Sequence, residues 1–248
     1  MFINLEKAKN EFINYTNNYD SNDDMIELKI SHSLRVMEFA KNIATQMNLN
    51  EEDIEIAAII GLLHDIGRFD QQTIYKTYSD LNSFDHGDYA VEILDRDIRK
   101  YVETDKYDSL IKLAIKNHNK YEIEEGLSDR ELLFCKIIRD ADKLDILYQS
   151  TYRFWSGKEE LVNNSDIYDD VLTSINNEHL IKKDKKYENI NSVLFTVCYV
   201  FDINFKESFK ILKQENYINK IFDRFNYKDP QLISNINNKI NSYIDKQI

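Results

Sequence analysis

The stretch NEEDIEIAAIIGLLHDIGR, residues 50–68, decides the fold because it predicts one helix that is buried on almost every side. Asn50 is a good helix N-cap, and the three acidic residues after it place negative charge in the first turn. Almost every residue in 56–63 is apolar or small, which predicts a central place in a helical core. The segment then ends in two adjacent ionisable residues, His64 and Asp65. Such residues at the end of a buried segment indicate a functional site.

The rest of the chain also predicts helices joined by polar loops. The 248 residues include only 5 glycines and 1 proline, whereas all-β folds need many turn residues. Ser128 and Glu131 form a capping box, Asp85 can cap the helix that follows it, and Asp229 precedes proline at a predicted first helical position. Apolar spacing predicts helices near 31–48, 85–94, 108–118, 128–147, 165–181, 191–201, 205–225 and 230–246. No Gly-, Pro- or Ser-rich linker separates them. We therefore predict a single all-α domain.

Composition and charge limit the kinds of molecule that the protein is expected to bind. The formal net charge is −12, which is poorly matched to extended nucleic acid but does not exclude a small phosphorylated ligand, since a bound cation can reverse the local field. No apolar stretch approaches the roughly 18 residues needed to span a bilayer, so we expect no membrane partner. Cys135 and Cys198 lie in apolar segments without metal-like spacing and are predicted to be reduced core residues. These features together favour a cytoplasmic protein.

Four of the five histidines form a set, because they lie at or near predicted helix ends with apolar neighbours one turn away: His32, His64, His86 and His118. A single histidine of this kind is more often a hydrogen-bonded core residue. Several helix ends that each deliver one imidazole, with a carboxylate beside them, are how helical bundles build metal sites. Histidine nitrogen and aspartate oxygen suit Mn, Fe, Co, Ni, Zn or Mg, and Asp65 could bridge two ions. His179 lies among Asn, Glu and Lys and is predicted to be a surface residue.

Three of the five glycines, Gly61, Gly67 and Gly87, lie within three residues of a histidine. We interpret them as supplying backbone freedom near the site. The alternative is that they end helices.

This pattern resembles the HD-domain superfamily of metal-dependent phosphohydrolases over roughly residues 28–150. The matching residues are His32 in ISHSLRV, His64 and Asp65 in GLLHDIGR, and Asp142 in RDADKLD. His86 in FDHGDYA and His118 in IKNHNK resemble the two extra histidines of the dinuclear subgroup. The resemblance implies an HD-type helical bundle, with the helices of 151–248 packed on an HD-like core at about 28–150.

The resemblance also implies a ligand set for two divalent transition metal ions. His32, His64, Asp65 and Asp142 would hold one ion. His86 and His118 would complete a second site, with Asp65 shared. Asp140 is a rival for the last ligand, but it lies about 200° from Asp142 around the same helix, so both cannot face the site. The family form Ala-Asp-basic-aliphatic favours Asp142.

Several other residues could contribute to the site. Arg68 could hold a phosphate oxygen, as the family's basic residue at this position often does, or it could be a solvated arginine after a helix end. Asp145 could orient a ligand. Lys143 and Lys120 are weaker phosphate candidates. Two aromatic residues, Tyr75 and Tyr78, could cover a substrate base.

The function that follows is hydrolysis of a phosphoester or phosphoanhydride by metal-activated water, with Asp65 and Arg68 as the catalytic residues. The resemblance implies a nucleotide as the substrate. A similar ligand set serves the di-iron oxygenases of this superfamily, which is the first alternative. A non-catalytic ligand-binding module is the second. The sequence does not determine the oligomeric state.

Overall fold

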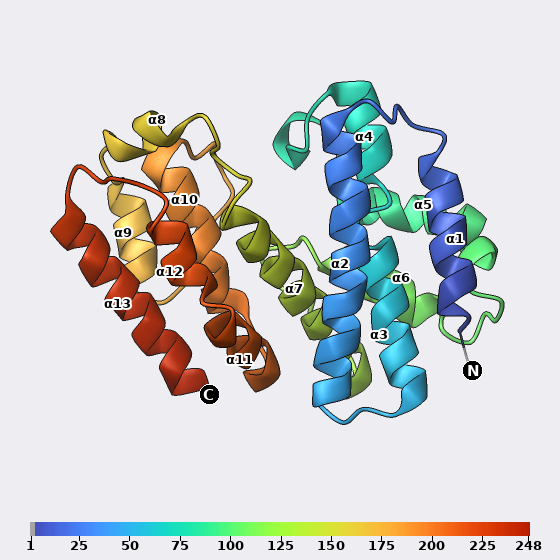
Figure 1. The fold of residues 1–248 in the computed structure, drawn as a ribbon. Helices are drawn as coiled ribbons and strands as arrows, with labels where there is room; N and C mark the ends of the chain where they lie inside the picture. The colour runs from blue at the N-terminus through green and yellow to red at the C-terminus, as the bar shows by residue number, and fades with distance from the viewer. Residues whose placement is uncertain (1–2) are drawn as a thin grey trace. The chain divides into compact units, whose positions relative to one another are not determined.

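The computed structural model describes residues 3–248, which form helices and loops without a β-strand (Figure 1). The all-α prediction is therefore confirmed for this part of the chain. The chain forms two compact units, one ending at Asp142 and one comprising Lys143–Ile248. A single domain stays a prediction. No helix within residues 3–248 has the length and apolarity needed to cross a bilayer.

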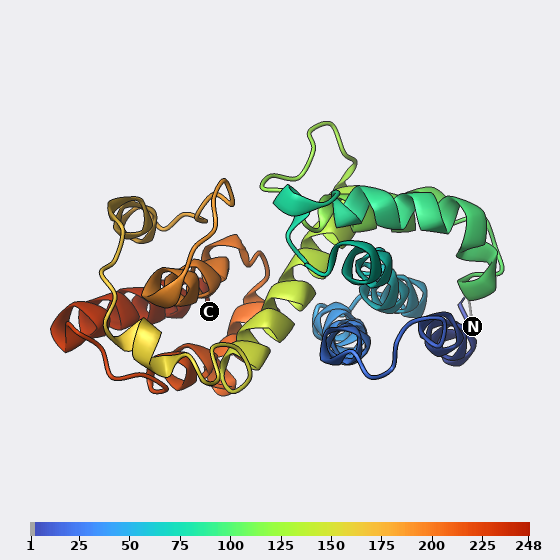
Figure 2. The same ribbon diagram turned by 90° about the horizontal axis from the view of Figure 1, so that it is seen from above.

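The first unit is built around α3 (Glu51–Leu63), the helix that the sequence places at the centre. Its residues 55–63 are all buried, and it contacts helices on several sides. Figure 2 shows α2 and α3 along their axes, while α5 runs across the view. The helices of this unit are α1 (Leu5–Thr16), α2 (Asp24–Gln46), α3, α4 (Arg68–Tyr75), the 3-10 helix η1 (Asp80–Asn82), α5 (His86–Tyr101), α6 (Asp108–Asn117) and the part of α7 (Asp129–Ser150) that ends at Asp142.

The helix starts that capping residues predict are confirmed. The Asn50 side chain accepts a hydrogen bond from the Asp53 backbone N–H, and Asp85 accepts from the N–H groups of Gly87 and Asp88. The Ser128–Glu131 capping box is reciprocal: the Glu131 carboxylate accepts from the Ser128 N–H, and the Ser128 hydroxyl accepts from the Glu131 N–H. Local sequence is therefore sufficient to fix where these helices begin.

One predicted boundary in the first unit needs correction. Helix α2 begins at Asp24, earlier than predicted, because the Asp23 side chain accepts from the Met25 N–H and caps it there. The polar stretch 70–84 divides into the end of α4, an irregular loop and η1.

The glycines near the histidines serve close packing and not backbone freedom. Gly61, Gly67 and Gly87 all lack a positive φ. A Cβ on Gly61 would lie 2.8 Å from the Val36 carbonyl oxygen, and one on Gly67 would lie 2.9 Å from the His86 carbonyl oxygen. The interpretation as backbone freedom is therefore wrong: a missing side chain lets neighbouring backbones approach.

The second unit contains the rest of α7 and a set of shorter helices. The predicted helix at 165–181 is only α9, and the one at 205–225 is broken at Asn216, which adopts the left-handed conformation with φ 55°. The final helix has its predicted Asp229 cap. Its helices beyond α7 are α8 (Glu159–Asn163), α9 (Asp169–Asn176), α10 (Asn189–Val197), the 3-10 helix η2 (Cys198–Asp202), α11 (Lys206–Gln214), α12 (Tyr217–Phe222) and α13 (Pro230–Gln247).

The predictions for isolated residues outside the site are also confirmed. Cys135 and Cys198 are both buried and free. His179 is exposed.

Candidate metal centre

The four site histidines reach one buried region of the first unit from four different helices. His32 lies within α2, and His86 is the first residue of α5. His64 and His118 are the C-caps of α3 and α6. Each of the four is at most 3% exposed. The sequence expectation that helix ends deliver these imidazoles holds for three of them, whereas His32 comes from within a helix.

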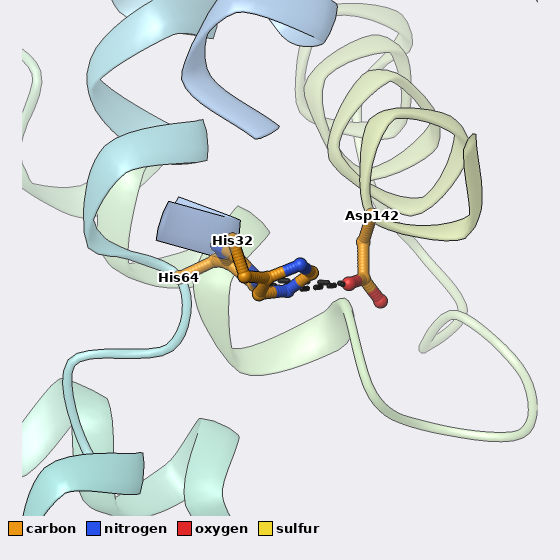
Figure 3. Close-up of side chains that lie close together, drawn as sticks. All are labelled: His32, His64 and Asp142. Carbon is orange, nitrogen blue, oxygen red and sulfur yellow. Dashed lines mark hydrogen bonds and ion pairs between the residues drawn. The ribbon is translucent and has the colours of Figure 1, made fainter. Parts of the chain in front are cut away.

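The first group consists of His32, His64 and Asp142, whose side chains point toward one another (Figure 3). The two Nε2 atoms lie 3.2 Å apart. Asp142 Oδ1 lies 3.1 Å from His32 Nε2 and 3.6 Å from His64 Nε2. A cation placed among these atoms would have two nitrogen donors and one oxygen donor.

The second group consists of His86 and His118, and Asp65 lies between it and the first group. His86 Nε2 and His118 Nε2 lie 2.9 Å apart. Asp65 Oδ1 lies 3.4 Å from His86 Nε2 and 3.7 Å from His118 Nε2. Asp65 Oδ2 lies 3.3 Å from His32 Nε2 and 3.5 Å from His64 Nε2. One carboxylate thus turns a different oxygen toward each histidine pair.

Hydrogen bonds at Nδ1 fix three of the imidazoles in the tautomer that ligates a metal through Nε2. His64 Nδ1 donates to the Gly61 carbonyl oxygen at 2.8 Å, and His118 Nδ1 donates to the Ile115 carbonyl oxygen at 2.6 Å. Both acceptors are carbonyls of the last helical turn, and the Ile115 oxygen also accepts from the His118 backbone N–H at 3.4 Å. His86 Nδ1 donates to Asp80 Oδ2 at 2.6 Å. A proton on Nδ1 leaves the Nε2 lone pair directed at the centre.

Burial and charge favour the protonation states that a metal site needs. Burial lowers the pKa of His64, and burial with the nearby Arg68 lowers the pKa of His86 to about 3. Burial alone would raise the pKa of Asp65, but Lys29 and the histidines hold it well below its usual value. The adjacent His32 and His64 side chains likewise hold the pKa of Asp142 well below its usual value against its burial. Neutral imidazoles and ionised carboxylates are the forms that bind metals.

Two residues at the site were missed by the sequence reasoning. Asp80 accepts from His86 Nδ1 with one oxygen and from Arg68 Nη1, at 2.9 Å, with the other. Lys29, one turn before His32 on α2, places its Nζ 2.6 Å from Asp65 Oδ2. The only signals that could have identified them are an acidic residue six positions before His86 and a lysine on the same helix face as His32.

Arg68 lies beside the site, but its guanidinium is engaged within the protein. The residue is buried, and Nη1 donates to the Gln71 side chain, the Tyr78 carbonyl oxygen and Asp80. Its Nε lies 3.5 Å from Asp65 Oδ1. The alternative of a solvated arginine is therefore wrong.

The remaining candidates divide between the site and its surroundings. Asp142 supplies the carboxylate that contacts His32 and His64, and this placement favours it over Asp140. Tyr78 lies under the Lys29 ammonium at 5.2 Å from ring centroid to Nζ, whereas Tyr75 is exposed.

Three other polar candidates have partners of their own. Lys120 pairs with Asp85 and Asp88. In the second unit, Lys143 pairs with Asp202, and Asp145 accepts from the Gln149 side chain.

The family model of the HD domain matches residues 30–147, the segment that carries all six of these histidine and aspartate residues. Residues 30–147 therefore carry an HD domain. HD domains are typically metal-dependent phosphohydrolases, which agrees with the resemblance drawn from the sequence. No curated protein matches the chain, and no solved structure does. The HD domain here has imidazole Nε2 and carboxylate oxygen donors, a set that fits divalent transition metals.

Proposed function

We propose that this HD domain binds two divalent cations and hydrolyses a phosphoester or phosphoanhydride of a small molecule, with a nucleotide as the substrate. The observation that carries the proposal is the position of Asp65. Its Oδ2 faces His32 and His64, and its Oδ1 faces His86 and His118. A carboxylate shared in this way is the bridge that a two-metal hydrolytic site requires.

The ligand assignment follows from these contacts. The first cation would take His32, His64, Asp142 and Asp65 Oδ2. The second would take His86, His118 and Asp65 Oδ1. This gives four and three protein donors, and an octahedral ion would keep open positions for water and substrate. Incomplete protein coordination is what separates a catalytic site from a structural one.

The chemistry needs no nucleophile from the protein. When bound, the cations would lower the pKa of a coordinated water and stabilise negative charge on the phosphoryl oxygens. Burial raises the pKa of the Cys135 thiol to about 12, so this thiol is not a nucleophile at neutral pH. The chain's own contribution is to hold Asp65 between the histidine pairs and to fix the imidazole tautomers.

The substrate class rests on charge and on the family. A chain with net charge −12 is a poor partner for extended nucleic acid, so a small phosphorylated compound is favoured. Bound cations would supply the local positive field that attracts it. The choice of a nucleotide rests on the HD resemblance.

The test combines metal content with the variant Asp65→Ala. We expect elemental analysis of the purified protein to give about two metal equivalents per chain, as in a two-metal site. The Asp65→Ala protein should lose its metal and should no longer release phosphate from the nucleotides of a test panel. Its circular dichroism spectrum should still show the helices. Asp105→Ala, an exposed aspartate of the same unit, is the matched control and should keep both.

Three outcomes would contradict the proposal. Full metal content and activity in Asp65→Ala would refute the site assignment. Two irons with oxygen consumption would identify an oxygenase. A wild-type protein that takes up no metal on reconstitution would indicate a ligand-binding module.

A further inference from the structure

Lys29 places a positive charge where the proposed ligand set would hold a cation. Its Nζ lies 2.6 Å from Asp65 Oδ2, the same oxygen that faces His32 and His64. The two side chains are 14% and 3% exposed, so solvent screens the contact only weakly. An ammonium and a divalent cation on one carboxylate oxygen would repel each other strongly at this separation.

The other basic side chains near the centre are held by acceptors of their own. Arg68 Nη1 donates to three protein groups. Lys120 bridges Asp85 and Asp88, outside the proposed ligand set. Arg68 Nε also lies 3.5 Å from Asp65 Oδ1, but its Nη1 is held by those three other groups, whereas the Lys29 ammonium donates to Asp65 Oδ2, an oxygen of a proposed ligand. A cation that takes Asp65 Oδ2 would therefore displace the ammonium from its acceptor.

The surroundings of Lys29 allow its head group to move. Lysine has a flexible four-carbon stem and a compact charge with three donors, unlike the rigid fork of arginine. The Tyr78 ring lies beneath the ammonium, and the Tyr78 hydroxyl donates to the Met25 carbonyl oxygen at 2.6 Å, which ties this ring to the first turn of α2. Partial exposure of the Lys29 side chain leaves it a route to solvent and to an anion.

We infer that Lys29 couples cation binding to phosphate binding at this site. Without a cation, Lys29 neutralises Asp65. When a cation binds Asp65, Lys29 is released and donates to the phosphate group of the substrate. Phosphate therefore strengthens cation binding by giving the displaced ammonium a new acceptor. The inference rests on the proposed function, and it makes Lys29 a substrate-holding residue as well as a competitor for the cation site.

The experiment measures binding of Mn²⁺ to metal-free full-length protein, with and without saturating inorganic phosphate. Free Mn²⁺ is counted by electron paramagnetic resonance. The variant Lys29→Met removes the charge and keeps the length of the side chain. Lys29→Gln, which is uncharged but can still donate to Asp65, is measured in parallel in case the methionine variant does not fold. Lys112→Met is the matched control, since Lys112 pairs with the exposed Asp95 in the same unit.

We expect both Lys29 variants to bind Mn²⁺ about tenfold more tightly than wild type without phosphate, since a competing charge is gone. Phosphate should strengthen Mn²⁺ binding in wild type and in Lys112→Met by about tenfold more than in the Lys29 variants. Equal Mn²⁺ affinities without phosphate, or equal gains on adding it, would overturn the role of Lys29 and leave the proposed function intact. A wild-type protein that binds no Mn²⁺ in either condition would overturn both.

Discussion

Replacing Gly61 with alanine would place a methyl group against the backbone of α2. The new Cβ would lie 2.8 Å from the Val36 carbonyl oxygen and 2.9 Å from Met37 Cα. Both are main-chain atoms, so rotating a side chain cannot relieve the contact. The two helices must separate by about half an ångström to restore ordinary van der Waals distances.

The cost of this separation can be worked from two opposing effects. Overpacking of this kind destabilises a protein by about 1–3 kcal/mol. Alanine is more favourable than glycine inside a helix by about 1 kcal/mol, and this higher helix propensity offsets part of the loss in stability. We therefore expect a net loss of up to about 2 kcal/mol, or up to about 8 °C in Tm for a chain of this size.

The same substitution should weaken the metal site, because it acts between two of its histidines. Gly61 is one turn before His64, and Val36 is one turn after His32. Separating α2 from α3 increases the 3.2 Å distance between the two Nε2 atoms. We expect Mn²⁺ affinity to fall by about tenfold, the order found when the groups that orient metal ligands are disturbed.

The assay is thermal unfolding with chelator present, followed by Mn²⁺ titration of Gly61→Ala and wild type. Glu51→Ala, an exposed position in the first turn of the same helix, is the control and should change stability by less than about 0.5 kcal/mol. A Gly61→Ala protein that is as stable as wild type and binds Mn²⁺ equally well would refute the close approach of α2 and α3 as the reason for this glycine.

Three further predictions concern the centre itself. Asp80→Asn should weaken one of two Mn²⁺ sites by about 10- to 100-fold, because the carboxylate that orients His86 is lost; two unchanged affinities in a titration would contradict this. Asp142→Ala should lose more metal than Asp140→Ala in elemental analysis, and the reverse order would show that Asp140 is the ligand. The pKa of His86 is about 3 in the folded state and returns to its ordinary value, about 6.5, on unfolding. The metal-free protein should therefore lose about 2 kcal/mol of stability between pH 7.5 and 5. The unfolded state then binds the extra proton, so stability falls as pH falls, and denaturant titrations at the two pH values should show a smaller loss for His86→Gln.

Much of the fold and site could be predicted because the signals are local. The buried helix over 56–63, the caps at Asn50 and Asp85, and the HD pair at its helix end follow from neighbouring residues and from helical period. The residues that the sequence offered as metal ligands do come together, from helices far apart in the chain. Their assignment as ligands stays a prediction until metal is measured.

The parts that sequence reasoning missed depend on contacts between distant segments. Asp80 looked like one more acidic residue in a polar loop, and its role appears only when that loop reaches His86 and Arg68. Lys29 lay before the helix predicted near 31–48, because α2 begins earlier, at Asp24. The break at Asn216 was hidden because the apolar spacing continues across it. Gly61 was read as flexible because a sequence does not show the backbone that lies against it.

The charges at this centre explain how it can fold before any cation binds. Three carboxylates gather there, Asp65, Asp80 and Asp142, and buried carboxylates without partners are costly. Lys29 and Arg68 offset part of that charge, while burial lowers the pKa of His64 and His86 and keeps these two imidazoles neutral. Arg68 is held by several acceptors and stays in place. Under the proposed function, only the Lys29 charge has to move when a cation arrives, so one side chain can serve both the stability of the metal-free fold and the recognition of an anionic substrate.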